Sequence, residues 1–355
     1  MDMLLTGLTF LFSASLAAIA AIYCLPHAER WGLIDHPCGG RKKHGHSTPL
    51  IGGIILWAAL LPLLIIKPAM GILPYSLPLV TLTVFIGLLD DRHELSAKLR
   101  LGVHLLIGLV MATWAGIQLK TLGELIPGVQ LSLGILAIPV TCFAVAASMN
   151  AVNMVDGVDG LAGALSLVPI AVVGVLAIHA GNTDLTLIAT ALSGGLCVFL
   201  LLNFPFPWRV RATCFMGDTG STLLGLMVAW LLIGGCSAHL FKPVLALFLL
   251  ALPLIDAAGV MLRRILRGDP VTAPGRDHLH HVFIDAGMTH RHVVYMLTCS
   301  AIAIAAMGLI LERNGTPEWI MFAIFASLLV TNLVLLRSAD RAKAVLREKV
   351  FSHRV

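Results

Sequence analysis

Long apolar segments alternate with short polar connections along almost the whole chain. Most of the apolar segments are near the roughly 20 residues that a helix needs to cross a bilayer core about 30 Å thick. They show no period-2 alternation of the kind that is typical of a transmembrane barrel, so they are predicted to be helices. Eleven membrane spans are predicted, at residues 3–25, 50–66, 73–89, 101–117, 131–149, 160–179, 185–203, 220–235, 244–262, 293–311 and 317–336.

The composition excludes an ordinary soluble domain. Of the 355 residues, 58% are hydrophobic and only 12% are charged, which is about half the charged fraction of a soluble protein. We therefore expect an all-α fold: a polytopic helical bundle with residues 1–336 as a single transmembrane domain and residues 337–355 as a basic tail. The first span has no basic segment before it and no small-residue cleavage site, so we interpret it as a retained span. The seven cysteines include no Cys-x-x-Cys pair, and no disulfide framework is indicated.

The basic residues are distributed unevenly between the two sides of the predicted bundle. Alternate connections and the tail hold 20 of the 24 Lys and Arg residues, whereas the other connections hold only Lys67, Lys120, Lys242 and Arg313. The positive-inside rule then places the N-terminus outside and the C-terminus inside. Because the net charge of +5 comes from these flanking residues, no nucleic-acid partner is expected.

Five aspartates lie at the inner ends of predicted spans. Carboxylates at membrane depth cost roughly 2.5–3.5 kcal/mol each, so they persist only where they have a role. Asp next to glycine turns often caps a helix, but five on one face are too many for capping alone. All five fall on the side that the Lys and Arg distribution assigns to the inside, so they can meet in one place. They are Asp90, Asp91, Asp156, Asp159 and Asp218.

The oxygen ligands of this region favour a hard cation. Asn150, Asn153 and Asp156 are three residues apart, so at a helix end they share one face. Paired aspartates would repel one another unless a divalent ion neutralised them, and Mg²⁺ typically takes one or two carboxylates plus substrate phosphates. The sequence therefore predicts a Mg²⁺ site, with Mn²⁺ as a substitute.

The long inner segment 263–292 adds the opposite charge. Guanidinium and imidazole donors beside a Mg²⁺ site suggest a clamp for a diphosphate, although anchoring the helix end is an equally simple role for each arginine. A zinc site has less support, because the histidines lack a His-Glu-x-x-His motif and a nearby cysteine. The candidate donors are Arg263, Arg264, Arg267, Arg276, His278, His280 and His281.

Three further polar residues receive separate interpretations. His44 belongs to a basic patch before the second span, where phosphate binding competes with anchoring. Asp256 is interpreted as a buried partner of one of the arginines in segment 263–292. His104 is interpreted as a packing residue that lies away from the acids.

At these motifs the sequence resembles the polyprenyl-phosphate N-acetylhexosamine-1-phosphate transferase superfamily, glycosyltransferase family 4, and is most similar to its WecA-type branch. The MraY-type branch, which uses UDP-MurNAc-pentapeptide, has a His-His-His-x-Glu loop, whereas Leu279 interrupts the histidines here and no Glu follows closely. The motifs in chain order are Pro49-x-x-Gly52-Gly53, Asp90-Asp91-Arg92, Asn153 to Leu161, Asn203, Gly217-Asp218-x-Gly220-Ser221 and His278-Leu279-His280-His281.

The resemblance implies an enzyme of the bacterial inner membrane with its site on the cytoplasmic face. It would transfer a sugar 1-phosphate, with N-acetylglucosamine first expected, from a UDP-sugar to undecaprenyl phosphate and release UMP. The product would begin the O-antigen or a related cell-envelope polysaccharide. Phosphoryl transfer depends mainly on positioning and charge neutralisation, which the acids, Mg²⁺ and the basic residues would supply.

The resemblance also implies a role for each candidate residue. Asp218 and Asp91 would bind the metal, and Asp90 or Asp91 would position or deprotonate the lipid phosphate. Asp156 would be catalytic. Asp159 and Phe215 would recognise the uracil, and the ring of Phe215 would stack on it. The residues implied in binding the rest of the substrate are His44, Asn153, Asn203, Arg263, His278, His280 and His281.

Several alternatives stay open at this point. Another UDP-N-acetylhexosamine is compatible with the same motifs, and the sequence does not decide whether two copies form a homodimer. A secondary transporter is the competing class, but transport favours acids within the spans and paired across an internal repeat. No Walker A, dinucleotide or Gly-x-Ser-x-Gly motif occurs, so ATP-driven pumping, redox chemistry and serine hydrolysis have no support.

Overall fold

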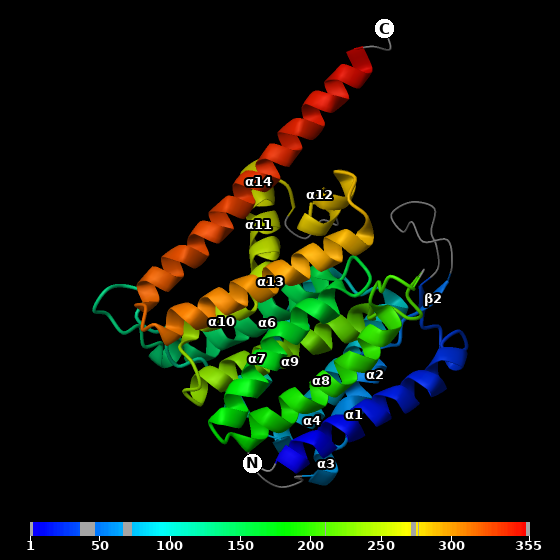
Figure 1. The fold of residues 1–355 in the computed structure, drawn as a ribbon, viewed down its shortest axis with the longest axis vertical. Coiled ribbons are helices and arrows are strands. Elements are labelled where there is room, and N and C mark those ends of the chain that lie inside the picture. Colours follow the sequence, from blue (N-terminus) through cyan, green and yellow to red (C-terminus); the bar gives the residue numbers. More distant parts are fainter. Residues whose placement is uncertain are drawn as a thin grey trace.

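A computed structural model describes residues 3–35, 47–66, 73–209, 211–270, 275 and 277–352. Most of these residues are helical, and the helices pack into a bundle (Figure 1). The elements are α1 (Met3–Cys24), η1 (Leu25–His27), β1 (Ile34–Asp35), β2 (Thr48–Pro49), α2 (Gly52–Leu60), α3 (Leu63–Ile66), α4 (Leu73–His93), α5 (Ala97–Thr113), η2 (Gly134–Leu136), α6 (Ala137–Val155), α7 (Leu161–His179), α8 (Thr183–Asn203), α9 (Gly217–Ser237), α10 (Pro243–Leu249), α11 (Ala251–Arg267), α12 (Leu279–Asp285), α13 (His290–Arg313) and α14 (Glu318–Ser352).

The fold confirms an all-α membrane protein. Among the described residues, seven helical segments are long and apolar enough to cross a membrane, or eight if the bent pair α10 and α11 is one span. The predicted span 50–66 is divided between α2 and α3, the span 73–89 lies within the 21-residue helix α4, and the span 101–117 overlaps the 17-residue helix α5. Every predicted span therefore contains helix, while the count of eleven crossings and the orientation stay predictions.

The predicted span 244–262 is interrupted. It consists of α10 and α11, which meet at Leu250 with a bend of 83°. Pro253 has no N–H to donate, and its ring would clash with the carbonyl of Leu249 four residues earlier, so one straight helix cannot pass through this point. As a result, α11 rises out of the bundle beside α12 in Figure 1.

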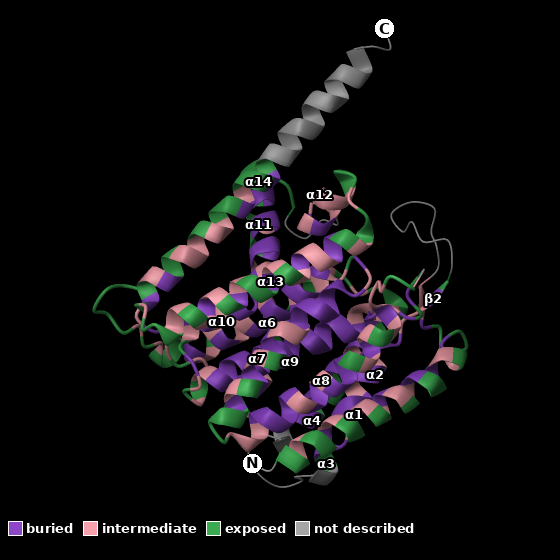
Figure 2. Ribbon diagram, in the orientation of Figure 1, coloured by how far each residue is buried: buried purple, intermediate pink, exposed green. Residues whose placement is uncertain are grey.

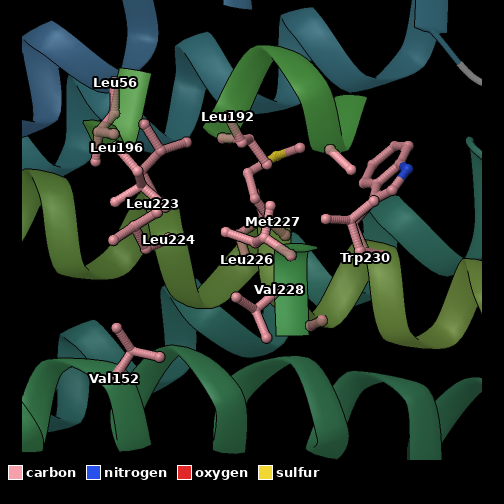
Figure 3. Packing of buried hydrophobic residues seen from close by; sticks show 14 of the residues in the cluster. Leu56, Val152, Leu192, Leu196, Leu223, Leu224, Leu226, Met227, Val228 and Trp230 are labelled. Atoms are coloured by element: carbon pink, nitrogen blue, oxygen red, sulfur yellow. The ribbon is translucent and has the colours of Figure 1, made fainter. Parts of the chain in front are cut away.

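The centre of the bundle is α9. In its most apolar window 94% of the residues are buried, against 17% in that of α14, and Figure 2 shows the buried residues concentrated among α6, α8 and α9. Leu223 and Met227 of α9 pack between Leu196 of α8 and Val152 of α6 (Figure 3). A helix that is apolar on all sides is stable only when other helices surround it, and α9 has that environment.

Glycines allow two neighbouring helices to approach the start of α9 closely. A β-carbon on Gly87 of α4 would lie 2.5 Å from the α-carbon of Thr219, and one on Gly53 of α2 would lie 2.8 Å from the backbone nitrogen of Gly220. Only glycine fits at such distances. The N-terminal turn of α9 is therefore held between α2 and α4.

Exposed tryptophans mark the two ends of the bundle. Trp31 and Trp208 follow η1 and α8 at one end, whereas Trp114 and Trp319 lie at the end of α5 and the start of α14 at the other. Tryptophan is enriched at both membrane–water interfaces, so these residues indicate the levels at which the bilayer surfaces lie. The motif residues at the ends of α4, α6 and α8 and the start of α9 are at the level of Trp31 and Trp208.

The contact between α4 and α9 predicts a stability effect. Gly87→Ala should destabilise the protein by about 1–3 kcal/mol, because the new methyl group meets the Thr219 backbone, which cannot move aside. Gly102→Ala in α5 is the matched control, since a β-carbon there meets nothing within 4 Å, and it should be neutral or stabilise by up to about 1 kcal/mol. Thermal unfolding in detergent measures both, and equal melting temperatures would contradict the tight contact.

Candidate active site

The start of α9 is fastened to α4 by the carboxylate of Asp91. Its Oδ1 accepts a hydrogen bond from the backbone N–H of Asp218 at 2.6 Å, and its Oδ2 accepts from the backbone N–H of Thr219 at 3.1 Å and from the Thr219 hydroxyl. Gly217 begins the turn with a φ of +70°, and a side chain there would collide with the same carboxylate. Asp91 thus satisfies N–H groups that have no partner within α9, where the helix dipole favours a negative charge.

Asp218, next to this turn, is oriented by α6. The Asn153 amide donates to Asp218 Oδ1 at 2.5 Å and also to the Ser221 hydroxyl at 2.9 Å. Asn153 and Asp218 are far apart in the sequence, and the packing of α6 against α9 brings them together. The Asn153–Leu161 and Gly217–Ser221 motifs therefore meet, as predicted for the shared inner-face site.

Arg100 was not among the predicted site residues. Its Nη1 lies 3.3 Å from Asp90 Oδ2 and 3.4 Å from Asp218 Oδ2, so one guanidinium joins the carboxylates of α4 and α9. Asp90 is buried, and its Oδ1 accepts from the Leu95 backbone N–H at 2.8 Å. In the sequence Arg100 was only one of many basic residues on the inner side. Its contact with the two carboxylates depends on the position of α5 next to α4 and α9, which the sequence does not show.

His104 corrects one prediction. It was expected to lie away from the acids, but it is one helical turn after Arg100, and on α5 both side chains therefore face the same way. Its Nδ1 accepts from the Asn150 amide at 3.1 Å. With Asp90 and Arg100 it lines a small cavity between α4, α5 and α9.

Asp156 and Asp159 lie in the turn that follows α6. Both are half-buried, and Asp156 ends the helix. Burial raises the pKa of Asp156 well above its usual value, and the nearby carboxylates, above all that of Asp218, raise it further. The aspartates predicted to share a site are therefore close enough to repel one another.

Asn203 connects two parts of the site through backbone contacts. Its Oδ1 accepts from the Gly160 N–H at 2.6 Å, and its amide nitrogen donates to the Cys214 carbonyl at 2.8 Å. Three residues before Asp218 on the same segment, the Phe215 carbonyl accepts a hydrogen bond from the Gly52 N–H at 3.0 Å, so the first turn of α2 also contacts this segment. Asn203 is buried and Phe215 half-buried, which makes Asn203 a structural link and leaves the ring of Phe215 partly accessible.

Residues 277–281, the histidine segment, follow α11 and lie near the same region. The ring of His280 lies against the turn that carries Asp156, since a β-carbon on Gly157 would be 2.3 Å from its Nε2. The rings of His278 and His280 are stacked with their centroids 5.7 Å apart, and the ring centroids of His280 and His281 are 4.2 Å apart. The predicted approach of the histidines to the acids is thus observed for His280.

The partner of Asp256 differs from the prediction. Its Oδ2 lies 2.9 Å from His278 Nδ1, and its Oδ1 accepts from the Leu279 N–H at 2.9 Å. The arginines expected to bind it, Arg263 and Arg264, instead pair with Asp277, each at 3.3 Å. These contacts depend on how the chain after α11 folds back against that helix, which the sequence pattern alone does not show.

His44 and Arg276 lie outside the described residues. Among the remaining candidates, the carboxylates near Asp156 are those of Asp91, Asp159 and Asp218, and carboxylate oxygens suit Mg²⁺. Within the described ranges, no group of three or more His, Cys, Asp or Glu side chains is arranged to hold an ion by itself. The residues therefore fit an ion shared with substrate phosphates, whose charge would also relieve the repulsion at Asp156.

The sequence has close relatives along most of its length. Residues 73–235, which include all five predicted aspartates, match glycosyl transferase family 4. Three relatives carry the name undecaprenyl-phosphate alpha-N-acetylglucosaminyl 1-phosphate transferase. The protein of Yersinia pestis is 38% identical over 320 residues, 89% of this chain and 86% of its own. The protein of Salmonella typhi is 36% identical over 333 residues, which cover 91% of this chain and 89% of its own. The protein of Escherichia coli K12 is 35% identical over 308 residues, which cover 84% of this chain and 82% of its own.

Identity at this level over most of both chains is enough to assign the family. The chain belongs to glycosyl transferase family 4.

Proposed function

We propose that this protein transfers N-acetylglucosamine 1-phosphate from UDP-N-acetylglucosamine to undecaprenyl phosphate. The observation that supports this most directly is the arrangement of Asp218, which Asn153 and Arg100 contact from two other helices in the motif region shared with the named transferases. An oxygen of the lipid phosphate attacks the phosphorus that bears the sugar, and the bond from that phosphorus to UMP breaks. The products are UMP and a lipid diphosphate sugar.

The residues of the site have separate tasks in this reaction. Asp218 and Asp156 would hold Mg²⁺, which would neutralise the phosphate charge when bound. Asn153 fixes the orientation of Asp218, and Asp91 holds the start of α9 in place. Arg100 supplies a guanidinium between the carboxylates, where it can also bind a phosphate oxygen.

The position of the site suits two substrates that arrive from different phases. It lies at the ends of helices, at the level of Trp31 and Trp208, where the lipid phosphate group and a water-soluble nucleotide can both reach it. The Lys and Arg distribution supports a cytoplasmic position for this level, and the membrane we propose is the bacterial inner membrane. The product would be the first lipid-linked sugar of an O-antigen or a related envelope polysaccharide.

Two alternatives have less support. A transporter needs ion-binding acids near the midplane of the membrane, whereas here they gather at one end of the bundle. Transfer from UDP-MurNAc-pentapeptide has less support, because the relatives are named as N-acetylglucosaminyl 1-phosphate transferases. In addition, Leu279 interrupts the histidines of this chain.

The first prediction concerns activity and its metal. Purified protein in detergent, given UDP-N-acetylglucosamine and undecaprenyl phosphate, should form a lipid-linked sugar and UMP in equal amounts. EDTA should abolish product formation, and Mg²⁺ or Mn²⁺ but not Zn²⁺ should restore it, because the ligands are hard oxygens. UDP-glucose and UDP-MurNAc-pentapeptide serve as control donors. No transfer from any donor would refute the proposed function, and full activity in EDTA would refute the metal.

The second prediction concerns Asp218. Asp218→Asn should lower kcat at least about 100-fold while the protein remains monodisperse, because the metal loses a carboxylate and the Asn153 contact loses its charged acceptor. Asp269→Asn is the matched control, since Asp269 is exposed on the same side of the protein, in the loop after α11. Both variants are assayed at saturating substrates. Near-normal turnover of Asp218→Asn would remove Asp218 from the reaction.

The third prediction concerns orientation. In a protein without the seven native cysteines, Lys120→Cys should react with an impermeant thiol reagent added to intact cells, and Lys98→Cys should react only after the cells are opened. Both positions are exposed in the structure, so accessibility alone does not separate them. The reverse pattern would place the site on the outer face, where the nucleotide sugar is absent.

A further inference from the structure

We infer that Asp256 is a positioning residue that sets the tautomer and orientation of His278, an inference that rests on the proposed function. Asp256 is buried on α11, and both of its carboxylate oxygens contact the start of the histidine segment. Oδ2 lies 2.9 Å from His278 Nδ1, and Oδ1 accepts from the Leu279 N–H at the same distance. The contact therefore fixes both the ring of His278 and the backbone that follows it.

The chemistry of the pair assigns the proton on the ring. An ionised carboxylate only accepts hydrogen bonds, so Nδ1 of His278 must carry the hydrogen. Nε2 is then the nitrogen that is available away from Asp256, as an acceptor in the neutral ring and as a donor in the imidazolium.

The ring of His278 is connected to the acidic side of the site through His280. The two rings are nearly parallel, with an interplanar angle of 6° at 5.7 Å. The ring of His280 in turn lies against Gly157. In the sequence, Gly157 stands between Asp156 and Asp159. A change in the orientation of His278 would therefore be transmitted to the turn that contains two of the aspartates.

A second anchor makes the role of Asp256 separable from simple loop attachment. Asp277, directly before His278, is held on α11 by Arg263 and Arg264, each at 3.3 Å. Removing the charge of Asp256 would leave this anchor intact. The expected consequence is an altered histidine on an attached segment, with little loss of overall stability.

The kinetic test uses Asp256→Asn, which keeps the shape of the side chain and removes its charge. The KM for UDP-N-acetylglucosamine should rise, or kcat fall, by roughly 10–100-fold, as is typical when a carboxylate behind a functional histidine is lost. The KM for undecaprenyl phosphate should change less than about twofold. The double variant with His278→Gln should be no worse than His278→Gln alone, because Asp256 acts through that ring.

The matched control is Asn332→Leu. Asn332 donates to the carbonyl of Ile255, the residue before Asp256, at 3.0 Å, so this variant changes the packing of α11 on its α14 side. It should leave the donor KM unchanged. If Asp256→Asn lowers the melting temperature as Asn332→Leu does and raises both KM values equally, Asp256 is only structural and the inference is wrong.

A measurement that is independent of activity separates the inference from the proposed function. In protein labelled with ¹⁵N-histidine, the signal of His278, identified by its loss in His278→Gln, should show a protonated Nδ1, and Asp256→Asn should shift the proton toward Nε2. An unprotonated Nδ1 in the native protein, or wild-type kinetics in Asp256→Asn, would overturn the inference. If the native protein transfers no sugar phosphate, the proposed function fails, while the ¹⁵N signal still decides whether Asp256 sets the tautomer.

Discussion

The carboxylate of Asp91 on the N-terminus of α9 is the interaction on which the rest of the site depends. A buried helix leaves N–H groups without partners at its start, and within a membrane protein water is a poor substitute. Asp91 accepts from the N–H groups of both Asp218 and Thr219, and hydrogen bonds to a charged acceptor contribute about 1.5–3 kcal/mol each. The same contact places the side chain of Asp218 at the end of the most buried helix, beside α6.

Bringing carboxylates together in this way has an electrostatic cost that the site must offset. Burial raises the pKa of Asp156, and the nearby carboxylate of Asp218 raises it further. Arg100 offsets part of the charge by lying between Asp90 and Asp218. A divalent cation shared with substrate phosphates would offset more of the negative charge.

The two halves of the site are built differently. The acids come from the ends of packed helices, where glycines such as Gly87 allow the backbones to touch and fix the distances. The histidines belong to a segment that is attached to α11 by ion pairs, through Asp256 and Asp277. Rigid placement suits the groups that organise the ion and the attacking phosphate, and a segment attached through side chains suits groups that must admit and release a nucleotide sugar.

The sequence by itself determined the helices and the motifs. Apolar segment length and the placement of charges are local properties, so the membrane class, the helical spans and the grouping of the aspartates on one side could be predicted from them. The family motifs then pointed to a phosphoryl transfer with Asp218 and the histidines on one face, and the packing of α6 on α9 agrees with that plan.

Only the tertiary structure decided the partners of each side chain. Asp91 was predicted as a metal ligand, and the structure adds that both of its oxygens accept hydrogen bonds from the start of α9. Arg100 and His104 were not predicted as site residues, and their contacts with Asp218 and Asn150 depend on how α5 packs in the bundle. Asp256 contacts His278 because the chain after α11 folds back against that helix. The physical reason is that contacts between distant helices depend on their rotation and crossing, which are set by the packing of many residues at once and leave no local pattern in the chain.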